Sequence, residues 1–106
     1  MSKTLKEKRI ELHNKLQVIA GNHKVYFQPP EGPQIEYPCI IYERYDMPIK
    51  YADNENYNIR CKYKITVIDK VPDSDLVDRM SKFKGAKFNR HFASNGLNHD
   101  IFIVYY

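Results

Sequence analysis

The stretch from Tyr57 to Asp69, Tyr-Asn-Ile-Arg-Cys-Lys-Tyr-Lys-Ile-Thr-Val-Ile-Asp, decides the fold. Apolar side chains occupy the odd positions Tyr57, Ile59, Cys61, Tyr63, Ile65 and Val67. Polar side chains occupy the even positions Asn58, Arg60, Lys62, Lys64 and Thr66. This alternation indicates a β-strand with one buried and one hydrated face. Such a strand is stable inside an antiparallel sheet whose apolar side is covered by helices, so we expect it to be the central strand.

The size and composition are those of one soluble domain. The chain has 106 residues, of which 42% are hydrophobic and 28% charged, and its formal net charge is +4. A single domain over residues 1–106 is therefore expected. No apolar run approaches the roughly 18 residues of a membrane span, and the basic N-terminus is not followed by an apolar segment of a signal peptide. Cys39 and Cys61 lack the Cys-x-x-Cys spacing of a zinc site, and we expect two reduced core thiols.

Two helices are predicted. The first covers residues 4–20 and ends at Gly21-Asn22. Its apolar stripe consists of Leu5, Leu12, Leu16 and Ile19. The second begins at Pro72-Asp73-Ser74, where Asp73 or Ser74 can cap it. Its inward side chains are Leu76, Val77, Met80 and Phe83.

Four further strands accompany the central one. They are expected at Lys24–Gln28, Cys39–Tyr45, Phe88–Ser94 and Leu97–Tyr105, and the last two flank the hairpin turn Asn95-Gly96. The order is α-β-β-β-α-β-β. The sequence therefore predicts an α+β fold, a mostly antiparallel sheet of four to five strands with two helices packed on one face.

A projecting hairpin arm is expected at about residues 46–56, because this connection is too long for a tight turn. If the hairpin is centred near residue 50, Cys39 faces Cys61 and Ile41 faces Ile59. Glu43 would then face Tyr57. The tip residues Met47, Ile49 and Tyr51 suggest that the arm docks on a partner, and the alternative is a solvent loop.

His91 and His99 lie on either side of the Asn95-Gly96 turn. Because their residue numbers sum to 190, a two-residue turn would place them near each other across the ladder. With Asp100, such a pair could bind a divalent metal or cleave phosphodiesters. However, His99 and Asp100 are neighbours in a strand and point to opposite faces. A polar cross-strand pair is the simpler interpretation.

A basic strand face is the other candidate for chemistry. Arg60, Lys62 and Lys64 could follow a phosphate backbone, with Tyr42 and Arg44 of the next strand beside them. The alternative is an ordinary solvated face. Because the sequence holds no Gly-rich phosphate loop, no serine-hydrolase elbow and no His-Glu-x-x-His motif, we expect no enzyme: no catalytic, cofactor-binding or metal-binding residues.

Several segments together resemble one family. They are Val25–Pro30, Tyr37–Tyr42, Tyr63–Lys70, Pro72–Ser74 and Asn95–Asp100. In this order they resemble the tail-completion proteins of long-tailed (siphovirus-type) bacteriophages, and within that group the tail-terminator type. The resemblance covers most of the chain from Val25 onward, and its motifs are structural. Other small neck proteins, such as head-closure or connector components, share the size and fold style.

The resemblance implies a structural virion protein without catalytic residues or cofactors. Proteins of this family form a ring, typically a hexamer, at the head-proximal end of the tail tube, end tube polymerisation and provide the joint to the head connector. The implied partners are further copies of itself, the major tail tube protein, a head-closure or connector protein, and DNA passing through the channel without sequence-specific contact; no membrane is involved. Such a protein is made in the host cytoplasm and located in the virion tail or neck.

Two surfaces could join copies of the chain, namely the arm and the C-terminal strand, which is apolar on both faces. The expected subunit or partner interface comprises Met47, Ile49, Tyr51, Tyr57, Phe102, Val104 and Tyr106. The alternatives are another neck protein or a module that binds single-stranded nucleic acid.

Overall fold

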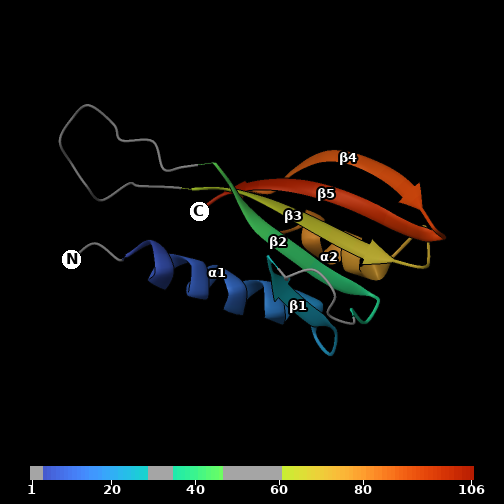
Figure 1. Ribbon diagram of the computed structural model, residues 1–106, viewed down its shortest axis with the longest axis horizontal. Coiled ribbons are helices and arrows are strands. Elements are labelled where there is room, and N and C mark those ends of the chain that lie inside the picture. The colour runs from blue at the N-terminus through green and yellow to red at the C-terminus, as the bar shows by residue number, and fades with distance from the viewer. Residues whose placement is uncertain (1–3, 29–34, 47–60) are drawn as a thin grey trace.

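A five-stranded mixed sheet with both helices on one of its faces forms the framework of the computed structural model, which describes residues 4–28, 35–46 and 61–106 (Figure 1). In chain order the elements are α1 (Leu5–Ala20), β1 (Lys24–Phe27), β2 (Cys39–Asp46), β3 (Lys62–Asp69), α2 (Asp75–Ser81), β4 (Lys87–Ser94) and β5 (Leu97–Tyr105). The predicted α+β class and element order are confirmed.

The strands lie side by side in the order β1-β2-β3-β5-β4, so β3 is central as predicted. One pairing differs from an all-antiparallel sheet: β1 and β2 are parallel, with Lys24 opposite Cys39 and Phe27 opposite Tyr42. A parallel pair needs a connection that returns the chain to the start of the next strand, and the segment between Phe27 and Cys39 is long enough to do so.

The alternation of β3 is reproduced in its burial. Tyr63, Ile65 and Val67 are fully buried on the helix-covered face, whereas Lys62, Lys64 and Thr66 are partly exposed on the other. Cys61 precedes the strand and exchanges two backbone hydrogen bonds of 3.0 Å with Tyr106. Residues 57–60 of the predicted strand lie outside the described residues.

The predicted register between β2 and β3 is wrong. Cys39 lies opposite Ile68 rather than Cys61, a displacement of seven residues (68 − 61), and the proposed pairs Ile41–Ile59 and Glu43–Tyr57 are likewise excluded. Glu43 faces Lys64 instead. Because side chains alternate along a strand, an odd displacement exchanges the two faces. The even positions Ile40 and Tyr42 of β2 therefore join the core.

The second helix begins at the expected cap, Ser74, and the first begins at a cap that was not predicted. Thr4 and Glu7 form a capping box at the start of α1, and Gly21, with φ of 64°, ends the helix. Leu12 and Leu16 are buried against the sheet, while Leu5 and Ile19 pack at the edge of the core. The side chain of Ser74 accepts a hydrogen bond from the Leu76 amide and caps α2, which buries Leu76 and Met80.

The hairpin of β4 and β5 is confirmed. Ser94 and Leu97 form the last pair before the turn, and Asn95 and Gly96 have φ of 52° and 76°. Two positive φ angles are characteristic of a type I′ turn, which matches the right-handed twist of the strands.

Candidate interaction surface

Of the expected interface residues, the structure describes Phe102, Val104 and Tyr106. Met47, Ile49, Tyr51 and Tyr57 lie outside the described residues, as does the expected arm beyond Asp46, the last residue of β2. Phe102 and Val104 are only 2% and 0% exposed and belong to the hydrophobic core. For these two residues the expectation is corrected: the domain's own helices cover this face of β5, and the side chains present no surface to another copy.

Tyr106 is partly buried beside α1. Its hydroxyl donates a hydrogen bond to Glu11, and the Lys15 ammonium lies 4.8 Å from the centre of its ring. The hydrogen bond with Tyr106, more than any other contact, raises the pKa of Lys15. Tyr106 thus attaches the end of the chain to α1, and whether it also contacts a partner stays a prediction.

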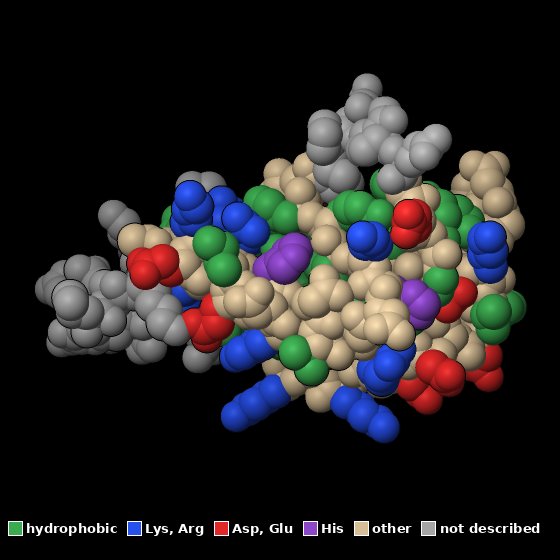
Figure 2. Space-filling view, turned by 90° about the horizontal axis from the view of Figure 1, so that it is seen from below, with side chains coloured by type: hydrophobic (Ala, Val, Ile, Leu, Met, Phe, Trp, Pro, Cys, Tyr) green, Lys and Arg blue, Asp and Glu red, His purple; other side chains and the backbone are tan. Residues whose placement is uncertain are grey.

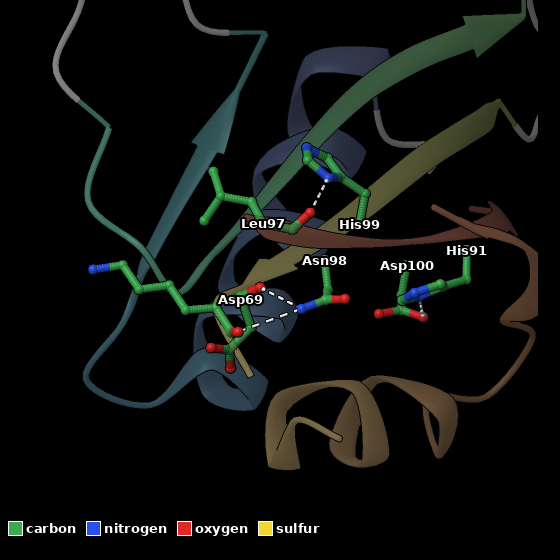
Figure 3. Close-up of polar contacts among 7 residues, drawn as sticks. Asp69, His91, Leu97, Asn98, His99 and Asp100 are labelled. Carbon is green, nitrogen blue, oxygen red and sulfur yellow. Dashed lines mark hydrogen bonds and ion pairs between the residues drawn. The ribbon is translucent and has the colours of Figure 1, made fainter. Parts of the chain in front are cut away.

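The two histidines expected to face each other do not. With a two-residue turn at Asn95-Gly96, the residue numbers of opposite positions sum to 191. His91 therefore faces Asp100, and Phe92 faces His99. The His91 Nδ1 atom lies 2.8 Å from the Asp100 carboxylate. Figure 3 shows His99 and Asp100 on opposite sides of β5, as expected for neighbours in a strand.

The His99 side chain contacts Phe92 and the backbone of Leu97 instead. Its ring is stacked on Phe92 with centroids 4.5 Å apart, and its Nδ1 atom lies 3.2 Å from the Leu97 carbonyl oxygen. Within residues 4–28, 35–46 and 61–106, no three His, Cys, Asp or Glu side chains gather as metal ligands. The polar cross-strand pair is therefore what the structure contains at His91.

Because the register of β2 and β3 differs from the expected one, the side chains of the expected basic face do not all lie on the same side of the sheet. Lys62 and Lys64 lie on the helix-free face, while Arg60 is outside the described residues. Tyr42 and Arg44 lie on the helix-covered face, because they are even positions of β2. Tyr42 is fully buried, with its hydroxyl 2.7 Å from His13 Nδ1, and the Arg44 guanidinium lies 5.9 Å from the Tyr63 ring centre. Neither can stand beside the lysines.

A groove instead crosses the helix-free face. Its volume is about 410 Å³, and its lining residues are Ile41, Lys64, Thr66, Ile68, Arg90, Phe92, His99 and Ile101. Ile68 and Ile101 form an apolar floor and are each only 5% exposed, although neither belongs to the core beneath the helices. The side chains around them therefore shield much of their surface. The only sequence signal for this groove was the apolar character of β5 on both faces.

Cations and aromatic rings surround the floor of the groove. The Arg90 guanidinium lies 5.0 Å from the ring centre of Phe92. Lys64 is 3.6 Å from the Glu43 carboxylate across the β2–β3 ladder, and both side chains are substantially exposed. Such exposed pairs are weak, so Lys64 can exchange its partner at little cost.

The remaining sequence candidates for reactivity are inert. Cys39 and Cys61 are buried free thiols, as expected. Burial raises the pKa of Cys39 to about 12, which keeps the thiol protonated and unreactive at neutral pH.

Fold and surface together define an α+β domain with helices on one sheet face and a cation-edged apolar groove on the other. The chain matches none of the protein-family models and none of the curated proteins with which it was compared. Neither of the described helices has the length and apolar character needed to cross a membrane.

Proposed function

We propose that this chain is a structural virion protein of the tail-terminator kind. It forms a ring, typically of six copies, at the head-proximal end of a phage tail tube, stops tube polymerisation and provides the joint to the head connector. Its partners are then its own copies, the tube protein and a connector protein, with DNA passing through the channel.

The observation that supports this proposal is the groove on the helix-free sheet face. The domain has a complete core under its helices, yet it also has a partly apolar surface on the opposite face. Hollows of a few hundred cubic ångströms that combine apolar lining with a few polar groups are common binding sites. A closed ring needs a heterologous interface, in which one patch meets a different patch on the next copy.

The sheet edge formed by β4 provides a second adhesive surface. Among the described strands, β4 pairs only with β5, and nearly all of the β4 residues are exposed. An edge strand offers unpaired backbone groups that a neighbour can bind by strand addition. Lys87 and Arg90 on β4 disfavour indiscriminate pairing, so a correct partner must match their charge.

The decisive experiment adds the purified chain to tube protein that is polymerising in vitro and measures tube lengths by electron microscopy. We expect substoichiometric amounts to shorten the tubes and to leave a ring at one end of each. An unrelated basic protein of the same size is the control. Tubes of unchanged length with bare ends would contradict the proposal, and binding to connector particles alone would identify another neck protein.

A second function, binding of single-stranded nucleic acid, is favoured by one observation. Lys64 and Arg90 lie on the same face as the aromatic ring of Phe92, and Lys62 lies 4.8 Å from the ring centre of Tyr45. Charge combined with stacking platforms is the pattern of single-strand binders. Binding of a labelled oligonucleotide that weakens steeply with salt would support this function. Absence of binding at low salt would exclude it.

A further inference from the structure

The groove has a chemical preference that can be read from its lining. Its apolar lining, with the partly exposed Ile41 and Phe92 above the nearly covered Ile68 and Ile101, accepts an aliphatic side chain, and Lys64 and Arg90 lie beside it. A fitting ligand therefore combines an exposed branched apolar side chain with carboxylates close to it on both edges.

The chain itself carries such a segment at residues 71–75, Val-Pro-Asp-Ser-Asp. Val71 is 54% exposed, and Asp73 and Asp75 are exposed next to it. Figure 2 shows acidic side chains gathered at the right-hand end of the molecule, the end at which the chain passes from β3 to α2 in Figure 1.

This segment is held in shape before any partner binds. The Val71 amide donates a hydrogen bond of 3.1 Å to the Asp69 carboxylate, and the Ser74 hydroxyl donates one of 2.6 Å to the same carboxylate. Because both ends of the segment are anchored to Asp69, docking requires little further ordering of the backbone.

We infer that the groove binds the 71–75 segment of a second copy of the chain. Val71 of the neighbour packs against the apolar lining of the groove at Ile41 and Phe92, and Asp73 and Asp75 meet Lys64 and Arg90. The groove and the segment are different surfaces, so the contact is heterologous and propagates from copy to copy until a ring closes. This inference rests on the proposed function and names the interface of the ring.

A second copy fits the groove better than a nucleic acid strand does. A phosphate backbone would neutralise Lys64 and Arg90 but has no aliphatic group for the apolar lining. The 71–75 segment satisfies both features, and its charge is opposite to that of the groove edges.

The test is a charge exchange between the two surfaces. Lys64→Glu/Arg90→Glu reverses the groove, Asp73→Lys/Asp75→Lys reverses the segment, and a third variant carries all four changes. Lys82→Glu/Lys84→Glu, on exposed residues after α2, is the control for the groove reversal, because it changes the net charge by the same amount. Self-association is measured by sedimentation velocity over a concentration series, and circular dichroism verifies that each variant is folded.

We expect each double reversal to weaken self-association by about tenfold or more, and the four-residue variant to recover most of it. The control should associate like the wild type. A variant Val71→Asp, which leaves the cations intact, should weaken association as well. These outcomes together would establish the interface.

Three results would overturn the inference. The first is that the Lys64→Glu/Arg90→Glu variant self-associates as strongly as the wild type. The second is that the wild-type chain forms no oligomer, either in solution or at the ends of tubes. The third is a groove reversal that abolishes oligonucleotide binding without changing self-association, which would assign the groove to nucleic acid.

If the variant with the reversed groove still forms rings that stop tube growth, the inference fails while the proposed function stands. If the wild type associates through the groove but leaves tube length unchanged, the proposed function fails and the interface remains.

Discussion

Individual side chains in this domain serve burial and anchoring, and the pair of His13 and Tyr42 illustrates how. His13 on α1 lies 2.7 Å from the Tyr42 hydroxyl across the helix–sheet interface. Burial, and secondarily the charge of Arg9, lowers the pKa of His13, and burial raises the pKa of Tyr42. Both side chains are therefore neutral at neutral pH, which is the form that a partly buried pair requires.

This pair predicts a pH dependence of stability. Because the folded state holds His13 with a pKa below its ordinary value of 6.5, the unfolded state binds the proton more readily. The contribution of His13 is complete above pH 6.5 and is lost as the pH falls from there through the lowered folded pKa. Urea unfolding at pH ~7.5 and ~5.5 should show this loss in the wild type, and a smaller difference in His13→Gln. An unchanged dependence in His13→Gln would show that other groups cause it.

A substitution at Phe102 distinguishes a role in the hydrophobic core from a role in a subunit interface. Replacing this buried ring by alanine should cost about 3–5 kcal/mol of the free energy of unfolding, measured by denaturant titration. Phe88→Ala is the matched control, because Phe88 is 58% exposed and contacts Phe102 with ring centroids 5.7 Å apart. It should cost much less. A stable Phe102→Ala protein with impaired self-association would return Phe102 to the interface.

At the scale of the element, local signals set the ends of helices and turns. The Ser74 cap and the Asn95-Gly96 turn lie where the sequence predicts them, because each depends on contacts within a few residues. The Thr4–Glu7 box is equally local, although it was not predicted. α2 depends most on its cap, since seven residues are too few to be helical without one.

Ser74→Ala should therefore destabilise the protein by about 1–2 kcal/mol, because the substitution removes the cap and leaves the Asp69 carboxylate with one donor fewer. Thermal and urea unfolding measure the loss. Ser81→Ala at the other end of α2 is the control: its hydroxyl donates to the Asp78 carbonyl, but the site is exposed. Equal effects of the two substitutions would contradict a special role of the cap.

At the scale of the whole molecule, the order of strands distributes stability unevenly. Within the part of the sheet that the structure describes, β3 and β5 each pair on both sides, whereas β1 and β4 pair on one side. β1 is also the shortest strand described, with four residues. The side chains of β4 that line the groove are thus held less firmly than the side chains of β3 and β5 that form its floor.

Amide hydrogen exchange followed by NMR should reflect this order. The slowest amides should lie in β3 and β5, and those of β1 and of the outer edge of β4 should exchange faster, because local opening frees edge strands first. Measurement on dilute, monomeric protein avoids protection by neighbouring copies. Equally slow exchange in β1 and β3 would be inconsistent with the sheet order.

The sequence alone determined the elements of this protein and the centre of its sheet. The alternation of Tyr63, Ile65 and Val67, the helix stripes and the caps are local patterns, which arise from periods of 2 and 3.6 residues along the chain. The pairing of His91 with Asp100 likewise follows from the two-residue turn at Asn95-Gly96, because a hairpin turn fixes the register of its strands. Only the tertiary structure decided the parallel pairing of β1 and the seven-residue displacement between β2 and β3.

The groove belongs to this second group. Ile41, Lys64, Arg90 and Ile101 come from four different strands, and they share a face only in the observed register. The periodicity of one strand specifies which of its side chains share a face, but not which strand lies beside it or at what displacement. Those choices depend on how the whole core packs, because a shift by an odd number of residues exchanges every buried side chain for an exposed one.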